Sequence, residues 1–109
     1  MAPTTDATEP EFGDDLTFTR QTDRGAVGGT WVVGLVAGHR FQALVFRDHA
    51  EDPTWELGAS RISKLWVQRL ADRAVVFNFD RGLDVPAQDT AAREVVDFLA
   101  AGLVEHVFA

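Results

Sequence analysis

The chain has 109 residues, of which 46% are hydrophobic and none is cysteine. This length leaves room for one hydrophobic core. The lack of cysteine excludes disulfide frameworks, thiolate metal sites and cysteine nucleophiles, and it predicts a cytoplasmic location. The formal net charge of −7 predicts no affinity for nucleic acid, because such affinity requires a basic face.

The composition changes near residue 15. Residues 1–14 are rich in Pro, Thr and acidic side chains, so we predict that they form a disordered acidic leader. We expect residues 15–109 to form a single α+β domain that is nearly neutral. The leader lacks the basic and apolar regions of a signal peptide, and no later segment is apolar over the length of a membrane span. We therefore expect neither export nor a membrane partner.

Five segments alternate apolar and polar residues, as half-buried strands do. A two-residue turn at Gly38 and His39 is expected to join the second segment to the third as a hairpin. The stretch 48–60 contains Pro53 and Gly58 and is predicted to be the longest loop, the kind of segment in which functional residues concentrate. The predicted strands are residues 16–22, 30–37, 40–47, 61–68 and 74–80.

A helix is predicted after Pro86, with Asp89 or Thr90 as its N-terminal cap. Its apolar residues recur at helical spacing and form one stripe. The predicted fold is therefore α+β, an antiparallel meander of about five strands packed against one C-terminal helix. The stripe consists of Ala92, Val95, Val96, Leu99 and Leu103.

One helix covers one face of a sheet, yet large apolar residues occur on both sides of the predicted strands. The examples are Trp31, Val33, Trp66 and Val76. Either the sheet curls over itself, or its second face is an interface. We expect a homodimer as the simplest solution.

A mixed-charge cluster is predicted where the fourth and fifth strands pair as antiparallel neighbours. Such a cluster suits a polar ligand or a peptide, with tryptophan as a stacking surface and arginines as bidentate donors. A purely structural role is the alternative, in which Asp80 caps a turn at Gly82 and Arg61 pairs with Asp84. The candidate binding residues are Arg61, Lys64, Trp66, Asp80, Arg81 and Asp84.

No cofactor or metal is predicted. The three histidines, His39, His49 and His106, form no ligand motif, and the local group at 48–52 has the character of a solvated acidic loop. Phosphate-binding and dinucleotide-binding loops are absent, because the glycine-rich stretch 25–29 precedes a strand and not a helix.

The segments "GASRISKLWVQR" and "VVFNFDRGLDV" resemble a family of small uncharacterised bacterial and phage-associated domains. The resemblance extends from about Trp31 to about Leu99 and implies a compact sheet-and-helix domain of unknown function. This chain departs from the family pattern at Phe79, where a tyrosine is usual.

Three functions are compatible with these features. The first is a non-catalytic binding or adaptor domain that acts through contact with a protein partner or a second copy. The second is an interference protein of the phage type that inhibits a host enzyme through the acidic leader and the loop. The third is a small enzyme that uses Asp80 or Asp84 with Arg61 or Arg81. Because no catalytic motif is present, a binding domain is expected rather than an enzyme.

Overall fold

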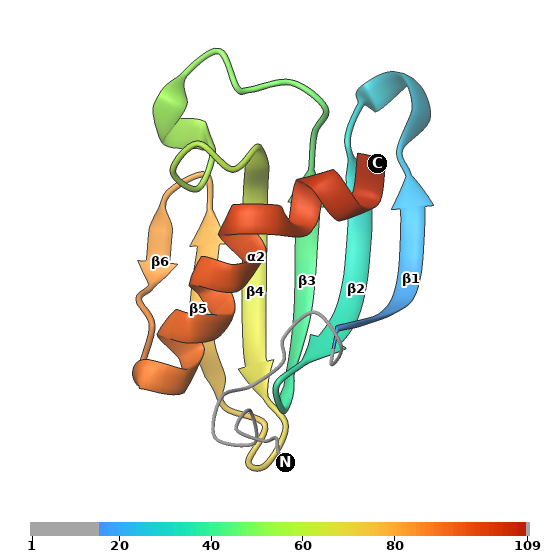
Figure 1. Cartoon of the computed structure of the whole chain (residues 1–109). Coiled ribbons are helices and arrows are strands. Elements are labelled where there is room, and N and C mark those ends of the chain that lie inside the picture. Colours follow the sequence, from blue (N-terminus) through green and yellow to red (C-terminus); the bar gives the residue numbers. More distant parts are fainter. Residues whose placement is uncertain (1–15, 109) are drawn as a thin grey trace, which may run out of the picture.

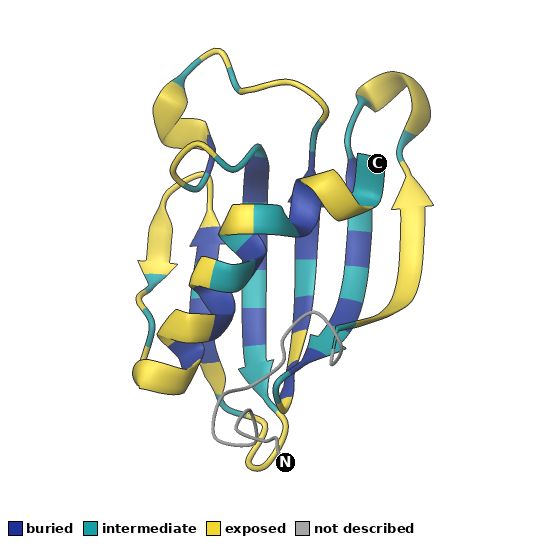
Figure 2. Ribbon diagram, viewed as in Figure 1, coloured by how far each residue is buried: buried dark blue, intermediate teal, exposed yellow. Residues whose placement is uncertain are grey.

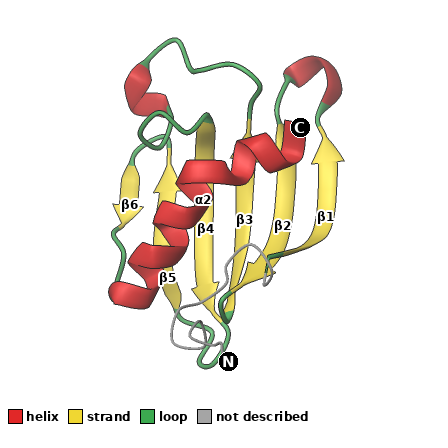
Figure 3. Cartoon of the chain, viewed as in Figure 1, coloured by secondary structure: helices red, strands yellow, loops and turns green. Residues whose placement is uncertain are grey.

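A computed structural model describes residues 16–108, which form an open antiparallel sheet with one long helix packed on it (Figure 1). The six strands follow one another in the order β1-β2-β3-β4-β5-β6, as a meander (Figure 3). This confirms the predicted α+β class, the meander and the C-terminal helix. The elements are β1 (Thr17–Asp23), β2 (Thr30–Val36), β3 (His39–Val45), β4 (Ile62–Arg69), β5 (Val75–Asp80), β6 (Leu83–Val85) and α2 (Thr90–Phe108), with short 3₁₀ turns η2 (Gly25–Val27) and η3 (Pro53–Trp55).

Two details differ from the sequence prediction. The sheet has a sixth strand, β6, whose three residues are too few for alternation to reveal. The β2–β3 turn consists of Ala37 and Gly38, whose φ angles of 50° and 75° suit a tight hairpin turn. His39 consequently lies in β3, where it is buried opposite Val36. The predicted leader, residues 1–14, lies outside the described residues.

Helix α2 begins where the sequence predicts. Asp89 Oδ1 accepts a hydrogen bond from the Ala92 N–H at 2.8 Å, which satisfies a free donor of the first turn. The helix crosses the sheet diagonally, from β5 toward β2 (Figure 1). No helix in the described part of the chain is long and apolar enough to cross a lipid bilayer.

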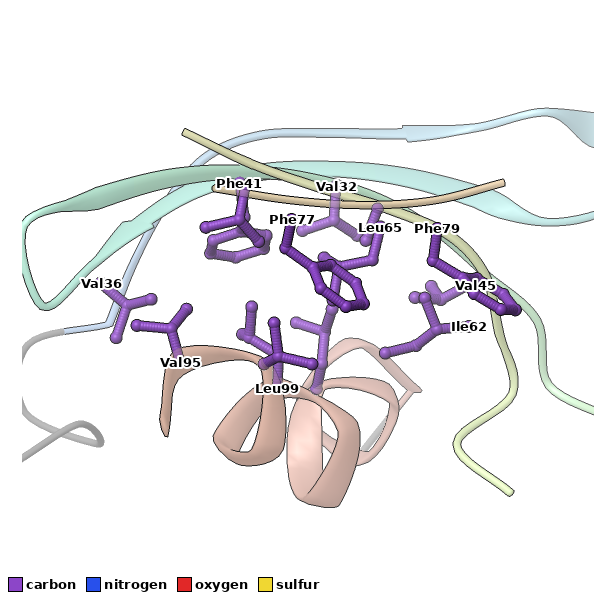
Figure 4. Packing of buried hydrophobic residues seen from close by; sticks show 14 of the residues in the cluster. Val32, Val36, Phe41, Val45, Ile62, Leu65, Phe77, Phe79, Val95 and Leu99 are labelled. Atoms are coloured by element: carbon purple, nitrogen blue, oxygen red, sulfur yellow. The ribbon is translucent and has the colours of Figure 1, made fainter. Parts of the chain in front are cut away.

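The hydrophobic core lies between α2 and one face of the sheet. Phe41, Leu65 and Leu99 have no exposed surface, and Figure 4 shows sheet and helix side chains meeting in this layer. Burial of a side chain of this size contributes about 1.5–3 kcal/mol. The predicted stripe of α2 is confirmed, because all five of its residues are buried, and Val104 extends it.

The other face of the sheet, here called the open face, bears no helix within residues 16–108. Most of its residues in β2 to β4 alternate with the buried ones (Figure 2) and are partly covered or exposed, whereas Leu44, opposite Trp31, is buried. The described sheet does not close on itself, since β1 and β6 are its two edges. The side chains of the open face include Arg20, Trp31, Val33, Arg40, Gln42, Lys64, Trp66, Asn78, Asp80 and Asp84.

Candidate functional site

The two motif-bearing strands pair as predicted. β4 and β5 are antiparallel neighbours, with Lys64 opposite Asp80 and Trp66 opposite Asn78. Directly opposite residues in an antiparallel pair point to the same face. The pairing therefore brings four of the six predicted binding residues together on the open face: Lys64, Trp66, Asp80 and Asp84.

Polar contacts organise this part of the open face. Lys64 Nζ lies 3.7 Å from Asp80 Oδ1 and 5.8 Å from the centroid of the Trp31 ring. Asn78 Nδ2 donates a hydrogen bond to Asp84 Oδ2 at 3.2 Å. Because Lys64 and Asp80 are both substantially exposed, their ion pair contributes little to stability. Both charges are accessible at the surface.

Charge is distributed unevenly across the open face. Arg20 and Arg40 flank a shallow depression floored by Trp31 and Val33, on the β1 to β3 side. The carboxylates of Asp80 and Asp84 belong to β5 and β6, at the other side. The face is therefore basic toward one sheet edge and acidic toward the other.

Arg61 and Arg81 lie elsewhere, in a cavity at one end of the sheet. Arg61 Nη2 donates to Glu105 Oε2 at 2.6 Å, and Nη1 donates to the Arg47 carbonyl oxygen at 2.9 Å. Asp84 accepts from Asn78, so the alternative Arg61–Asp84 ion pair does not form among the described contacts. The structure thus divides the predicted cluster between two places.

This cavity, here called the end cavity, has a volume of about 530 Å³. It lies between the β1–β2 connection, the 46–61 loop and the C-terminal end of α2, with Phe108 in its wall. Cavities of about 300–1,000 Å³ are typical of small-molecule sites. The sequence did not reveal it, because its walls come from segments far apart in the chain.

A histidine–carboxylate pair forms part of the cavity wall. His49 Nδ1 lies 2.8 Å from Glu56 Oε2, and the Ala50 N–H donates to Glu56 Oε1 at 3.0 Å. The Glu56 side chain is 6% exposed, whereas that of His49 is 61% exposed. Sequence reasoning sought acidic partners for His49 within 48–52 and missed Glu56, seven residues along the chain.

No group of three or more metal-binding side chains occurs within residues 16–108. At the opposite end of the sheet, the ion pair between Arg69 and Asp72 has a structural role. Hydrogen bonds from Arg69 hold the pKa of the Asp72 carboxyl down, at about 2, and the same pairing raises the pKa of Arg69. The Ala74 N–H also donates to Asp72, so this carboxylate stabilises the β4–β5 turn.

Comparison with known proteins gives a family without an assigned activity. No curated protein and no solved structure matches the chain. One family model matches residues 30–104, more than half of the chain, and agrees with the resemblance to an uncharacterised domain family. The bacterial or phage-associated setting of that family stays a prediction. The chain belongs to the family described as domain of unknown function (DUF7678).

Proposed function

We propose that this chain is a non-catalytic binding domain that acts through protein–protein contact and associates with a second copy of itself through the open face. The observation that carries the proposal is the sheet face opposite α2, which has partly covered Trp31, Val33 and Trp66 and no described element on it. Partly exposed tryptophans ringed by polar groups are typical of interfaces.

The size of the open face supports a stable contact. The six strands are three to eight residues long, and at the usual rise and spacing they present an area of about 600 Å² before the relief of side chains is counted. A standard interface buries about 800 Å² of accessible surface on each partner. The area of the open face is of that order, so two sheets packed face to face would bury enough surface for a stable dimer.

The charge distribution favours a second copy over an unrelated partner. A twofold axis parallel to the strands places β1 of one protomer over β6 of its partner. Arg20 of each protomer then faces Asp84 of the other, which gives two equivalent contacts. The Trp66 regions meet near the centre of the interface. The open face is therefore complementary to itself in charge.

The test is a charge exchange between two positions. Arg20→Glu and Asp84→Arg should each weaken the dimer, because each brings like charges together across the axis. The double variant should regain much of the affinity, since it restores opposite charges in reversed order. Arg93→Glu, on the exposed side of α2, is the matched control and should leave the dimer unchanged. The dissociation constant is measured by sedimentation equilibrium.

If both single variants dimerise like the original chain, the open face is not the interface. If the double variant is as weak as the singles, Arg20 and Asp84 do not face each other and the proposed axis is wrong. Capture of a different protein by the open face would replace self-association with an adaptor role. The absence of cysteine supports the reducing cytoplasm as the setting.

The two other functions stay predictions. Interference with a host enzyme depends on the leader, which lies outside the described residues. Removal of residues 1–14 should abolish partner capture if that function is correct. Catalysis by Asp80 or Asp84 with Arg61 or Arg81 has less support, because the arginines line the end cavity and the carboxylates belong to the open face.

A further inference from the structure

The end cavity has more free hydrogen-bond donors than acceptors. Arg81 is exposed, and its guanidinium makes no hydrogen bond or ion pair with any described residue. The Arg47 guanidinium lies 4.5 Å from the centroid of the Phe108 ring and has no hydrogen-bond partner within residues 16–108. Each guanidinium offers five N–H donors in a planar fork.

The acceptors in the same wall are largely occupied. Both carboxylate oxygens of Glu56 are engaged, one by His49 and one by Ala50. Asp23 Oδ1 accepts from the Gly25 N–H at 2.6 Å. The free carboxylate oxygens of the wall are Asp23 Oδ2 and those of Asp48, which is exposed in the loop. A ligand that fits these groups must therefore supply acceptors, and a carboxylate or phosphate matches the arginine fork.

Aromatic side chains provide the apolar part of the wall. Phe46 and Phe108 line the cavity, and Trp55, in η3, does so while 44% exposed. An indole exposed to that extent beside a cavity is available to cover a bound ring. The cavity thus combines flat apolar surfaces with free cationic donors.

Two arginines of the cavity wall, Arg61 and Arg81, have an unusual backbone conformation. Arg61 has a φ of 64° and Arg81 a φ of 55°, in the left-handed region that non-glycine residues seldom adopt. The Arg81 N–H donates to the Ser63 carbonyl oxygen at 3.0 Å, which holds this turn against the first residues of β4. Strained residues of this kind cluster at ligand sites, although turns also contain them.

From these observations we infer that the end cavity binds a small molecule with a flat apolar ring and an oxyanion head group, a phosphate or a carboxylate. Arg81 and Arg47 contact the head group, and Phe108, Phe46 and Trp55 contact the ring. Glu56 orients His49 at the rim, through the bond to Nδ1. None of the open-face side chains named above lines the cavity, so variants can be made in each site separately.

Binding is tested with four probes added to the isotopically labelled full chain: phenyl phosphate, benzoate, inorganic phosphate and benzyl alcohol. The readout is the shift of the Gly28, Ala50 and Ser63 amide resonances, which belong to three separate walls of the cavity. Phenyl phosphate or benzoate should shift all three. Inorganic phosphate and benzyl alcohol should bind more weakly, because each lacks one half of the ligand. The preference between the two anionic aromatic probes distinguishes phosphate from carboxylate.

The matched variants are Arg81→Gly and Arg73→Gly. Both positions have a positive φ, which glycine adopts without strain, so neither variant should unfold the chain. Arg73 lies in the β4–β5 turn and does not line the cavity. Arg81→Gly should weaken the better probe about tenfold, the usual effect of losing a charged hydrogen-bonded contact. Arg73→Gly should bind like the original chain.

Three outcomes would overturn the inference. The first is no shift of the three amides with either anionic aromatic probe. The second is unchanged affinity in Arg81→Gly. The third is equal affinity for benzyl alcohol or inorganic phosphate, which would show that the two halves of the cavity do not act together.

Discussion

Arg61 and Glu105 join the beginning of β4 to the last turns of α2, with Nη2 and Oε2 2.6 Å apart. The Arg61 side chain is 25% exposed and that of Glu105 is 66% exposed. The ion pair therefore holds one donor edge of Arg61 away from the end cavity, at the surface. Its contribution to stability should be small, because exposed pairs are screened by solvent.

Glu105→Gln should accordingly lower the free energy of unfolding by less than about 1 kcal/mol. The same change removes a competing carboxylate beside Arg61, so phenyl phosphate should bind the end cavity a few times more tightly. Urea denaturation and probe titration measure the two effects. Tighter binding with nearly unchanged stability is the expected result, and weaker binding would show that Glu105 supports the cavity.

Alanine substitutions at Gly34 and Gly102 test how tightly the chain packs around each glycine. A Cβ added at Gly34 would lie 2.6 Å from the Thr17 carbonyl oxygen and 2.7 Å from Phe41 Cζ. Gly34→Ala should therefore destabilise the chain by about 1–3 kcal/mol. A Cβ at Gly102, in α2, meets no atom within 4 Å, so Gly102→Ala should stabilise the chain by about 0.5–1 kcal/mol. Chemical denaturation distinguishes the opposite signs.

Glu56 is expected to hold the 46–61 loop. Glu56→Ala leaves the Ala50 N–H without its acceptor and should cost about 1–3 kcal/mol. Glu56→Gln keeps a carbonyl oxygen for that bond and should cost less. Hydrogen exchange at the Ala50 amide reports the difference directly. Equal exchange rates in the two variants would mean that the Ala50 bond does not hold the loop.

The Asp72–Arg69 pairing predicts a pH dependence at low pH. The folded-state pKa of Asp72 is lowered from 3.8 to about 2, so its stabilisation is present above 3.8 and is lost as the pH falls toward 2. Asp72→Asn should therefore reduce the urea midpoint clearly at about pH 5 and hardly at about pH 2. Arg69→Gln removes the main cause of the shift and should flatten the same window. An equal loss in Asp72→Asn at both pH values would contradict this assignment.

Much of the fold follows from local patterns in the sequence. β2 buries every second residue on one face, β3 does so from His39 to Ala43, and the stripe of α2 matches that face, so periods of two and of 3.6 residues identify both layers. β6 escaped prediction because three residues after Gly82, two of them exposed, show no periodicity. The turn at Ala37 needed a positive φ at alanine, which the residue type does not indicate.

The candidate sites were harder to predict, for a physical reason. Arg61 and Arg81 lie just outside the paired strands, where positive φ angles end the alternation that assigns a side chain to a face. Lys64 and Asp80 lie inside the paired region, and the sequence placed them together correctly. The end cavity depends on contacts between distant segments, such as Arg47 on Phe108, and these leave no local signal.

Self-association through the open face is tested most directly by the mass of the full chain in solution. Light scattering coupled to size-exclusion chromatography should give twice the 12.0 kDa of one chain, and the mass should fall toward one chain on dilution. A mass of one chain at every concentration up to the solubility limit would contradict self-association.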